Sequence, residues 1–357
     1  MEMSPARYII EIFTILLLFA LIDCRKNPVA SLDDIKQGRR DYEWFIDTLA
    51  LYNGDRFTPM RIWGSAPNDV WLTGSGDVSW NLLWHYDGVS WKKDSAQRQI
   101  APAALWGFAS NNIWLGTVSN TFWHYDGNKW YKYSEHVLPG FTYNMILSIW
   151  GRTPNEIYGV GASMNDTMVR GIIMKFNGIQ WNYMNISPTP GGFTDIRQQF
   201  GSGLFFLDGN VVLSGIGTVY KLYTFDGKSL TEIYSSPEYP ASVNEINGKI
   251  YCVYAKKIYK YRNNQLQLWL DLASTTFAGK VYGRSEKDFF GFATDRVGSY
   301  IQCAIGHYNG TDFQNLFELN TDFRVSCGFI FEKDVFFPCF SVTSNTVVVV
   351  HGKLKGE

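Results

Sequence analysis

Three histidines recur at one position of a repeated pattern, two residues before an Asp-Gly or Asn-Gly pair. They are His85, His124 and His307. Imidazoles that converge can bind a metal or transfer protons. Equivalent positions place these three on the third strands of different repeat units, and neighbouring strands are about 4.8 Å apart. They therefore cannot meet at one metal, and we interpret them as packing or hydrogen-bonding residues. No metal site and no cofactor are expected.

Four acidic residues recur just before the second strand of their units. They are Asp69, Glu156, Asp288 and Asp334. A ring of carboxylates would attract a cation or a basic partner. Acidic residues at such positions also stabilise turns through local hydrogen bonds, and we favour this second interpretation.

Signatures of catalysis are missing from the sequence. It contains no GxSxG, HExxH, phosphate-binding loop or dinucleotide-binding fingerprint. A glycosidase needs two carboxylates about 5–9.5 Å apart, and a sialidase-like site also needs clustered arginines. The arginines near the predicted inner strands are Arg61, Arg152, Arg284 and Arg324. We assign no catalytic residue, and a glycan-acting hydrolase or lyase remains the alternative function.

Aromatic residues precede the repeat glycine at the end of each inner strand. They are Trp63, Trp106, Trp150 and Tyr282. This position lies near one mouth of the expected central channel. Packing between units would explain such residues, and exposed ones could bind a sugar or a protein. These four are our candidate ligand-binding rim.

Cys327 and Cys339 are placed symmetrically about Lys333. If residues 332–334 form a three-residue hairpin loop, the two cysteines face each other across two strands. A cross-strand disulfide is then an option in an oxidising compartment. None of the five cysteines belongs to a CxxC pair, so the sequence does not support a zinc site.

These residues sit in a repeat of about 44 residues, a spacing typical of propeller blades with four short strands. Each of the first three units contains an aromatic-Gly pair, a polar turn, a β-branched or aromatic pair, an apolar run and an Asp/Asn-Gly pair, and the later units keep only parts of this pattern. The pair that opens the second strand begins at Val70, Ile113, Ile157, Val211, Ile250, Phe289 and Val335. The pattern predicts an all-β, seven-bladed β-propeller of four-stranded antiparallel blades.

The Asp-Gly and Asn-Gly pairs mark the hairpin between the third and fourth strands. They begin at Asp87, Asp126, Asn177, Asp226 and Asn309, with a looser Asn263-Asn264. Two-residue loops of this composition favour type I′ turns. The seventh unit is one strand short, and residues 42–49, YEWFIDTL, resemble a strand. We expect them to pair into the seventh blade and to close the ring, which would cover an open edge.

The N-terminus reads as a targeting segment. Arg7 precedes an apolar run at residues 12–22 that is too short to span a bilayer but has the length found in signal peptides. Leu21-Ile22-Asp23-Cys24 is similar to a bacterial lipobox, although Asp23 stands where a small residue is usual. We expect a signal peptide at residues 1–24 with lipidation at Cys24, a linker at 25–40 and the propeller at 41–357. An ordinary cleaved signal is the alternative.

The pattern IWGxxPNDVW…HYDGxxW, read from residues 62–91, resembles that of bacterial exported, lipoprotein-like β-propellers, a mostly uncharacterised group. The resemblance covers about residues 40–350. It implies a propeller fold and a surface or periplasmic location, and it does not imply an activity.

Charge and location limit the function. With 32 basic and 33 acidic residues, the chain has no basic excess to neutralise phosphates, so no nucleic-acid partner is expected. We expect a monomeric, noncatalytic binding or scaffold protein, anchored by lipid to the outer membrane or cell surface, with a periplasmic or secreted form as the alternative. Its ligand would be a glycan or a protein. Specificity is expected in residues 134–146, 162–170 and 183–197, around Tyr143, Asn165 and Phe193. A structural subunit of an envelope complex is the further alternative.

Overall fold

The computed structural model describes residues 37–51, 55–77, 82–94, 100–213, 217–238, 240–297 and 300–356. The chain divides into two compact units, Met1–Lys36 and Gln37–Glu357, and the described residues belong to the second unit. The predicted signal peptide, Cys24 and most of the predicted linker lie outside these ranges. Within them, every regular element is a β-strand, and no helix long and apolar enough to cross a membrane is found.

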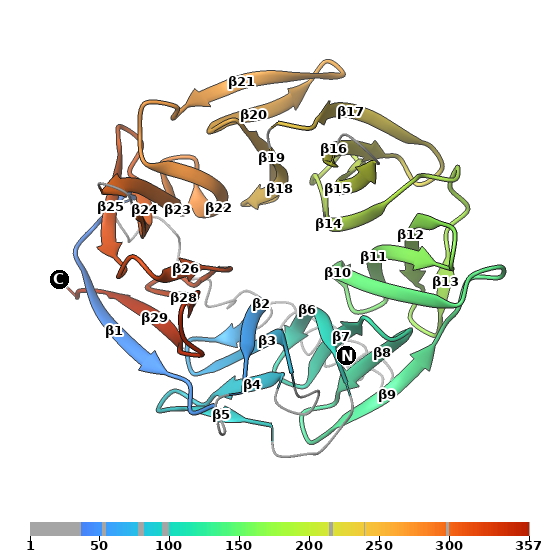
Figure 1. The fold of residues 1–357 in the computed structure, drawn as a ribbon, viewed down its shortest axis with the longest axis horizontal. Coiled ribbons are helices and arrows are strands. Elements are labelled where there is room, and N and C mark those ends of the chain that lie inside the picture. Colours follow the sequence, from blue (N-terminus) through green and yellow to red (C-terminus); the bar gives the residue numbers. More distant parts are fainter. Residues whose placement is uncertain are drawn as a thin grey trace, which may run out of the picture. The chain divides into compact units, whose positions relative to one another are not determined.

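The strands form consecutive antiparallel meanders (Figure 1). The first sheet contains β2 (Phe57–Ala66), β3 (Asp69–Gly76), β4 (Leu83–Tyr86) and β5 (Trp91–Lys93). The second contains β6 (Pro102–Ala109), β7 (Asn112–Thr117), β8 (Thr121–Tyr125) and β9 (Trp130–Glu135). The third contains β10 (Tyr143–Thr153), β11 (Glu156–Met164), β12 (Val169–Phe176) and β13 (Trp181–Tyr183). The fourth contains β14 (Gly192–Gln198), β15 (Phe205–Leu213), β16 (Gly217–Phe225) and β17 (Leu230–Ser236).

The next sheet has eight strands, made of two four-stranded runs that a single parallel bridge joins, between Ile246 and Gly283. The first run contains β18 (Ala241–Ile246), β19 (Lys249–Tyr254), β20 (Lys257–Arg262) and β21 (Gln265–Asp271). The second contains β22 (Phe277–Ser285), β23 (Asp288–Val297), β24 (Tyr300–Tyr308) and β25 (Phe313–Glu318). The last sheet contains β26 (Phe323–Val325), β27 (Phe329–Ile330), β28 (Asp334–Ser341), β29 (Val347–Leu354) and β1 (Tyr42–Thr48).

The first strands of successive sheets contact one another in cyclic order, from β2 through β6, β10, β14, β18, β22 and β27 back to β2. Figure 1 shows β2, β6, β10, β14, β18 and β22 in this order around the ring. The expected pairing of residues 42–49 with the C-terminal sheet is confirmed for Tyr42–Thr48, because β1 pairs antiparallel with β29 along all of its length, from Tyr42 opposite Leu354 to Thr48 opposite Val348. The N-terminal strand thus covers the edge of the C-terminal one.

Burial explains why the strands differ in composition. The second strands lie between neighbouring sheets, so β7 is buried on both faces and reads as an almost unbroken apolar run. The outer strand β9 is buried mainly at its first residue, Trp130. The repeat glycines give neighbouring aromatic rings room: a Cβ on Gly107 would lie 2.6 Å from the Trp63 ring of the preceding sheet.

We call the first residue of each outer strand the wedge residue, because in several sheets it packs against the preceding sheet. The wedge residues are Trp91, Trp130, Trp181, Leu230, Gln265, Phe313 and Tyr42. Trp130 packs edge-on against Trp71, Trp181 stacks 3.8 Å from Phe122, and Tyr42 packs edge-on against Phe290. These aromatic contacts cross from one sheet to the one before it.

Two details of the predicted repeat are wrong. The Asp-Gly tips are four-residue loops, because Tyr86 pairs with Trp91 and the Asp87 carboxylate accepts hydrogen bonds from the backbone N–H groups of Val89 and Ser90. A side chain that satisfies two amides stabilises this longer turn. In the fourth unit, the second strand begins at Phe205 rather than near Val211.

Candidate functional site

A cavity of about 250 Å³ lies where the inner strands converge. Its lining comes from β2, β6, β10, β14, β18 and β22 and from residues 326–330, so every sheet of the described chain contributes. The charged side chains that line it are Arg61, Asp195, Arg197, Glu245 and Lys280. Three cations and two carboxylates therefore share a small space at the centre of the ring.

Arg61 spans the cavity by binding backbone carbonyls. Its Nη2 donates hydrogen bonds to the oxygens of Leu147 and Thr194, both at 2.9 Å, and its Nη1 donates to Met60 at 3.1 Å. All three carbonyls belong to residues skipped by the strand register, in bulges of β2, β10 and β14. Because a bulge removes a carbonyl from the ladder, the guanidinium supplies donors that the strands lack.

Asp195 and Arg197 form an ion pair with an N–O distance of 2.5 Å. Ser148 donates a further hydrogen bond to the Asp195 carboxylate at 2.7 Å. Burial by itself raises the pKa of Asp195, but the cations of Arg197, Arg61 and Lys280 hold that pKa below its usual value. The carboxylate is therefore ionised and fixed in place.

The pKa values of Glu245 and Asp208 shift in the opposite direction from that of Asp195. Burial raises the pKa of Glu245, whose carboxylate accepts a hydrogen bond from the Trp150 indole at 3.2 Å. Burial also raises the pKa of Asp208, which accepts hydrogen bonds from Thr194 and from the Val243 amide. Burial and the neighbouring cations thus shift the pKa values of these buried carboxyls in opposite directions, down for Asp195 and up for Glu245 and Asp208.

Lys280 has a place in the cavity but no fixed partner. It is the residue skipped between Gly279 and Val281 in the register of β22, and its φ of 54° lies in the left-handed region. That conformation is costly for a side chain other than Gly, Asn or Asp. Within the described part of the chain, its ammonium forms no hydrogen bond or ion pair. The bulge therefore directs into the cavity a cation that has no hydrogen-bond or ion-pair partner in the described residues, although its charge acts on the nearby carboxyls of Asp195 and Asp208.

The four residues of the predicted aromatic rim differ in their surroundings: some are buried between sheets, and some line the central cavity. Trp63 is buried against Gly107 while also lining the cavity, and Trp150 is buried and not among the lining residues. Trp106 and Tyr282 are half-buried and line the cavity. The Arg197 guanidinium lies 6.0 Å from the centre of the Trp106 ring.

The repeated histidines form hydrogen bonds across adjacent strands, two of them with repeated acids and one with an asparagine. His85 binds Asp69 at 2.7 Å, His307 binds Asp288 at 2.9 Å, and His124 binds Asn112 at 2.9 Å. Each ring also packs on an aromatic of the second strand, such as Trp71 beneath His85. Glu156 pairs instead with Lys175, and Asp334 with His351, which the sequence analysis did not single out. The acids therefore link strands within a sheet.

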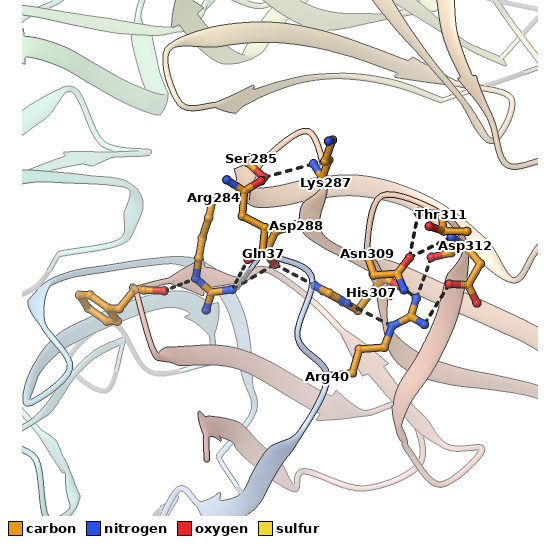
Figure 2. Close-up of polar contacts among 11 residues, drawn as sticks. Gln37, Arg40, Arg284, Ser285, Lys287, Asp288, His307, Asn309, Thr311 and Asp312 are labelled. Atoms are coloured by element: carbon orange, nitrogen blue, oxygen red, sulfur yellow. Dashed lines mark hydrogen bonds and ion pairs between the residues drawn. The ribbon is translucent and has the colours of Figure 1, made fainter. Parts of the chain in front are cut away.

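Residues just before β1 form hydrogen bonds and an ion pair with the run β22–β25 (Figure 2). Arg40 donates hydrogen bonds to the backbone oxygens of His307 and Asp312 and pairs with the Asp312 carboxylate at 3.0 Å. Arg284 lies on the far side of Asp288 and donates to the Phe331 oxygen. The last residues of the predicted linker thus make ordered contacts with a sheet.

Most of the arginines predicted near the inner strands do not line the central cavity. Of the four arginines, only Arg61 lines the central cavity: Arg152 lies over the Phe200 ring, Arg284 binds Asp288, and Arg324 binds the carbonyls of Thr321 and Phe323. Arg197 and Lys280 were missed. Arg197 lies in a unit whose repeat pattern is eroded, and the bulge that turns Lys280 inward leaves no mark in that pattern. Within the described residues, no group of three His, Cys, Asp or Glu could hold a metal.

The expected facing arrangement of two cysteines is wrong. The register places Val325 opposite Cys339, and Cys327 lies in the irregular segment between β26 and β27. Both thiols are free and buried.

The three residues predicted to lie in specificity-determining loops have different surroundings in the structure. Phe193 is only 1% exposed and belongs to the inner strand β14 rather than to a loop. Tyr143 is 36% exposed, and the Asn165 side chain stabilises its own turn through the amides of Thr167 and Met168.

Comparisons with known proteins support the fold. No family model and no curated protein matches the chain. Among solved structures, YCF48 bound to a D1 peptide is 13% identical with a TM-score of 0.59, over 90% of this chain and 98% of that one. YCF48 from Cyanidioschyzon merolae is 12% identical with a TM-score of 0.55, over 85% and 98%. A protein of unknown function from Dyadobacter fermentans is 10% identical with a TM-score of 0.52, over 87% and 98%. At these identities the likeness establishes a β-propeller fold alone.

Proposed function

We propose that the chain is a noncatalytic, exported binding protein built on a seven-bladed propeller. The count follows if the eight-stranded sheet is two blades, β18–β21 and β22–β25, and if β1 is the outer strand of the last blade. The cyclic order of the inner strands supports this interpretation. A rigid ring that presents fixed groups at its centre is suited to recognition.

The proposed location is the outer membrane or the cell surface, with Cys24 as the lipid-bearing first residue of the mature chain. The support is the sequence at residues 12–24, which lies outside the described residues. Mass spectrometry of the mature N-terminal peptide tests this: a lipid adduct on Cys24 is expected, and cleavage at another residue would contradict it.

The proposed ligand is a carboxylate-bearing segment of a partner protein, held at the central cavity. The observation that carries this proposal is Lys280, a cation without a fixed partner beside the pinned Arg61 and the paired Arg197. A carboxylate is the natural counterion for such an ammonium. The structure of YCF48 with a D1 peptide is a precedent for peptide binding on this fold.

The test uses the full-length chain as bait for envelope proteins, followed by peptide arrays of any partner. Lys280→Gly removes the ammonium and relieves the backbone strain, so it should keep the melting temperature while weakening partner binding at least about tenfold. Lys280→Arg should retain binding, and Lys92→Gly is a control on an exposed outer strand. Undiminished binding by Lys280→Gly would reject the central cavity as the binding site. A partner that copurifies stoichiometrically in every variant would instead favour a structural subunit of an envelope complex.

A second candidate is a glycan-acting hydrolase or lyase at the same cavity. The observation in its favour is that two carboxylates, Asp195 and Glu245, line it together with Arg61 and Arg197. The burial-raised pKa of Glu245 would suit a general acid. Turnover of envelope glycans that Glu245→Gln abolishes would support this candidate, and turnover unaffected by that change would reject it.

A further inference from the structure

A second cavity lies between the fourth sheet and the run β18–β21. It has a volume of about 770 Å³ and lies against the outer strand β17 on one side and against β19, β20 and β21 on the other. The two sheets contact each other through β18, which packs against β14, β15 and β16. The space between their outer parts forms a cleft, which we call the intersheet cleft.

The cleft is open because its wedge residue is not aromatic. The Trp130 indole fills the corresponding space between the first and second sheets, and the Trp181 indole fills the one between the second and third. The wedge position of β21 is held by Gln265, an exposed amide that lines the cleft. Tyr261 covers part of the floor, with its ring 5.2 Å from Phe206 of the fourth sheet. An indole-sized space thus remains between the two sheets.

The tip beside Gln265 also departs from the repeat. The four-residue tips carry a glycine at positive φ, such as Gly227 at 93° in the neighbouring sheet. Here the tip is Asn263-Asn264, and both residues have positive φ, 52° and 60°. Asparagine tolerates this conformation less well than glycine but adds an amide side chain. Within the described ranges, the side chains of Asn264 and Gln265 form no hydrogen bonds, so their amides are free to bind a ligand.

The lining indicates the chemical class of that ligand. It combines amides with the hydroxyls of Ser229 and Thr231 and with tyrosine rings, and it contains no Lys or Arg. An anionic ligand would therefore lack a counterion. Glu232 is paired with Lys221 at 2.7 Å, and two backbone hydrogen bonds hold the Asp226 carboxylate in its own turn. Asp226 is then the one lining carboxylate without an ion-pair partner in the described part of the chain, and the other polar groups of the lining are neutral amides and hydroxyls. A neutral polyhydroxylated ligand fits this lining best.

We propose that the intersheet cleft binds a neutral oligosaccharide, with one sugar ring in the space that the Trp130 and Trp181 indoles fill between other sheets. Aromatic faces and short polar side chains are the groups that bind sugars through stacking and hydrogen bonds. The volume is within the range of about 300–1,000 Å³ that ligand sites occupy. This site is independent of the central cavity and of the peptide proposed to bind there.

The test is binding of the full-length chain, in a detergent without a sugar headgroup, to an array of neutral oligosaccharides, followed by calorimetry on those that bind. Gln265→Trp restores the missing wedge and should weaken binding at least about tenfold while keeping or raising the melting temperature. Asn182→Trp places the same indole on the outer strand of another sheet, at an exposed residue, and should bind as the wild type does. Lys280→Gly should also retain sugar binding, which separates this site from the central cavity.

Asn264→Gly is the second variant, because it removes one amide and relaxes the tip without adding volume. It should weaken sugar binding several-fold with the melting temperature retained, even if Gln265→Trp does not fold. The proposal is overturned if the wild type binds none of the arrayed neutral sugars at millimolar concentration. It is also overturned if Asn264→Gly, or a folded Gln265→Trp, binds them as strongly as the wild type.

Discussion

Arg61 shows how a single residue can organise the centre of the ring. Its guanidinium donates hydrogen bonds to three backbone carbonyls, one in β2, one in β10 and one in β14. Each of these carbonyls belongs to a bulge residue, which the strand register skips. Arginine suits this role because its guanidinium presents five donors in a fixed plane. The same interactions leave Arg61 with little freedom to act as a ligand contact or as a catalytic group.

Replacing Arg61 should therefore destabilise the fold. Arg61→Met keeps much of the apolar stem but leaves the carbonyls of Leu147 and Thr194 without their donor. We expect a loss of about 3 kcal/mol in the free energy of unfolding, because hydrogen bonds from charged donors contribute about 1.5–3 kcal/mol each. Urea denaturation measures this loss. Arg324→Met is the control, because Arg324 binds carbonyls at the surface, and an equal loss in both variants would contradict the role of Arg61.

His307 should make the stability depend on pH. Its ring is fully buried, its Nδ1 accepts a hydrogen bond from Arg40, and its Nε2 lies 2.9 Å from Asp288. Burial lowers its pKa, with the Arg40 and Arg284 cations opposing protonation and Asp288 favouring it; Asp312 adjoins Arg40. Below a pH of about 6.5, the unfolded imidazole takes up a proton that the folded one resists. Stability should therefore be complete above that pH and fall as the pH falls.

The measurement is the free energy of unfolding between pH 7.5 and 5.5. A single such group contributes a slope of at most about 1.4 kcal/mol per pH unit. His307→Gln should flatten the curve, since glutamine can still accept from Arg40 and donate to Asp288 without titrating. An unchanged slope in this variant would assign the pH dependence to other groups.

At the level of elements, the repeat predicted the strands well because burial between sheets demands aromatic and β-branched residues at fixed spacing. The pairing of β1 with β29 followed from a unit that lacked one strand. The cavity was not predictable in the same way. Arg197, Glu245 and Lys280 lie in eroded units, and the register shift that turns Lys280 inward depends on the backbone. The four-residue tips were missed because the Asp side chain, rather than the Asp-Gly dipeptide, determines that turn.

Strand β1 should contribute strongly to stability. Deleting residues 40–50 removes the Arg40 contacts, the Tyr42 wedge against Phe290 and the cover over the edge of β29. We expect the melting temperature to fall by about 10 °C or more, since about 1 kcal/mol corresponds to 2–4 °C in domains of 150–250 residues. Phe45→Ser is the control, because Phe45 lies on the same strand with 44% of its surface exposed. A deletion variant that melts with the wild type would reject closure of the ring by β1.

At the scale of the whole molecule, the state of the cysteine thiols reports both on the interior of the ring and on the proposed lipid anchor. The described chain contains four free, buried thiols at Cys252, Cys303, Cys327 and Cys339. Burial raises the pKa of the Cys252 and Cys327 thiols to about 12, so neither forms the reactive thiolate at neutral pH. We expect slow modification by thiol reagents in the native protein and rapid modification after denaturation.

Counting thiols in the denatured, unreduced mature chain tests two proposals together. Lipidation consumes the thiol of Cys24, so a lipidated chain with free interior cysteines should give four thiols. A chain cleaved after Cys24 would also give four, and mass spectrometry of the mature N-terminal peptide separates these two cases. Five thiols would mean that Cys24 is retained without lipid. Two thiols would mean a lipidated chain with one internal disulfide, which would contradict the strand register that places Val325 opposite Cys339. A Cys24→Ser variant, which removes that thiol directly, should also give four and so calibrates the count.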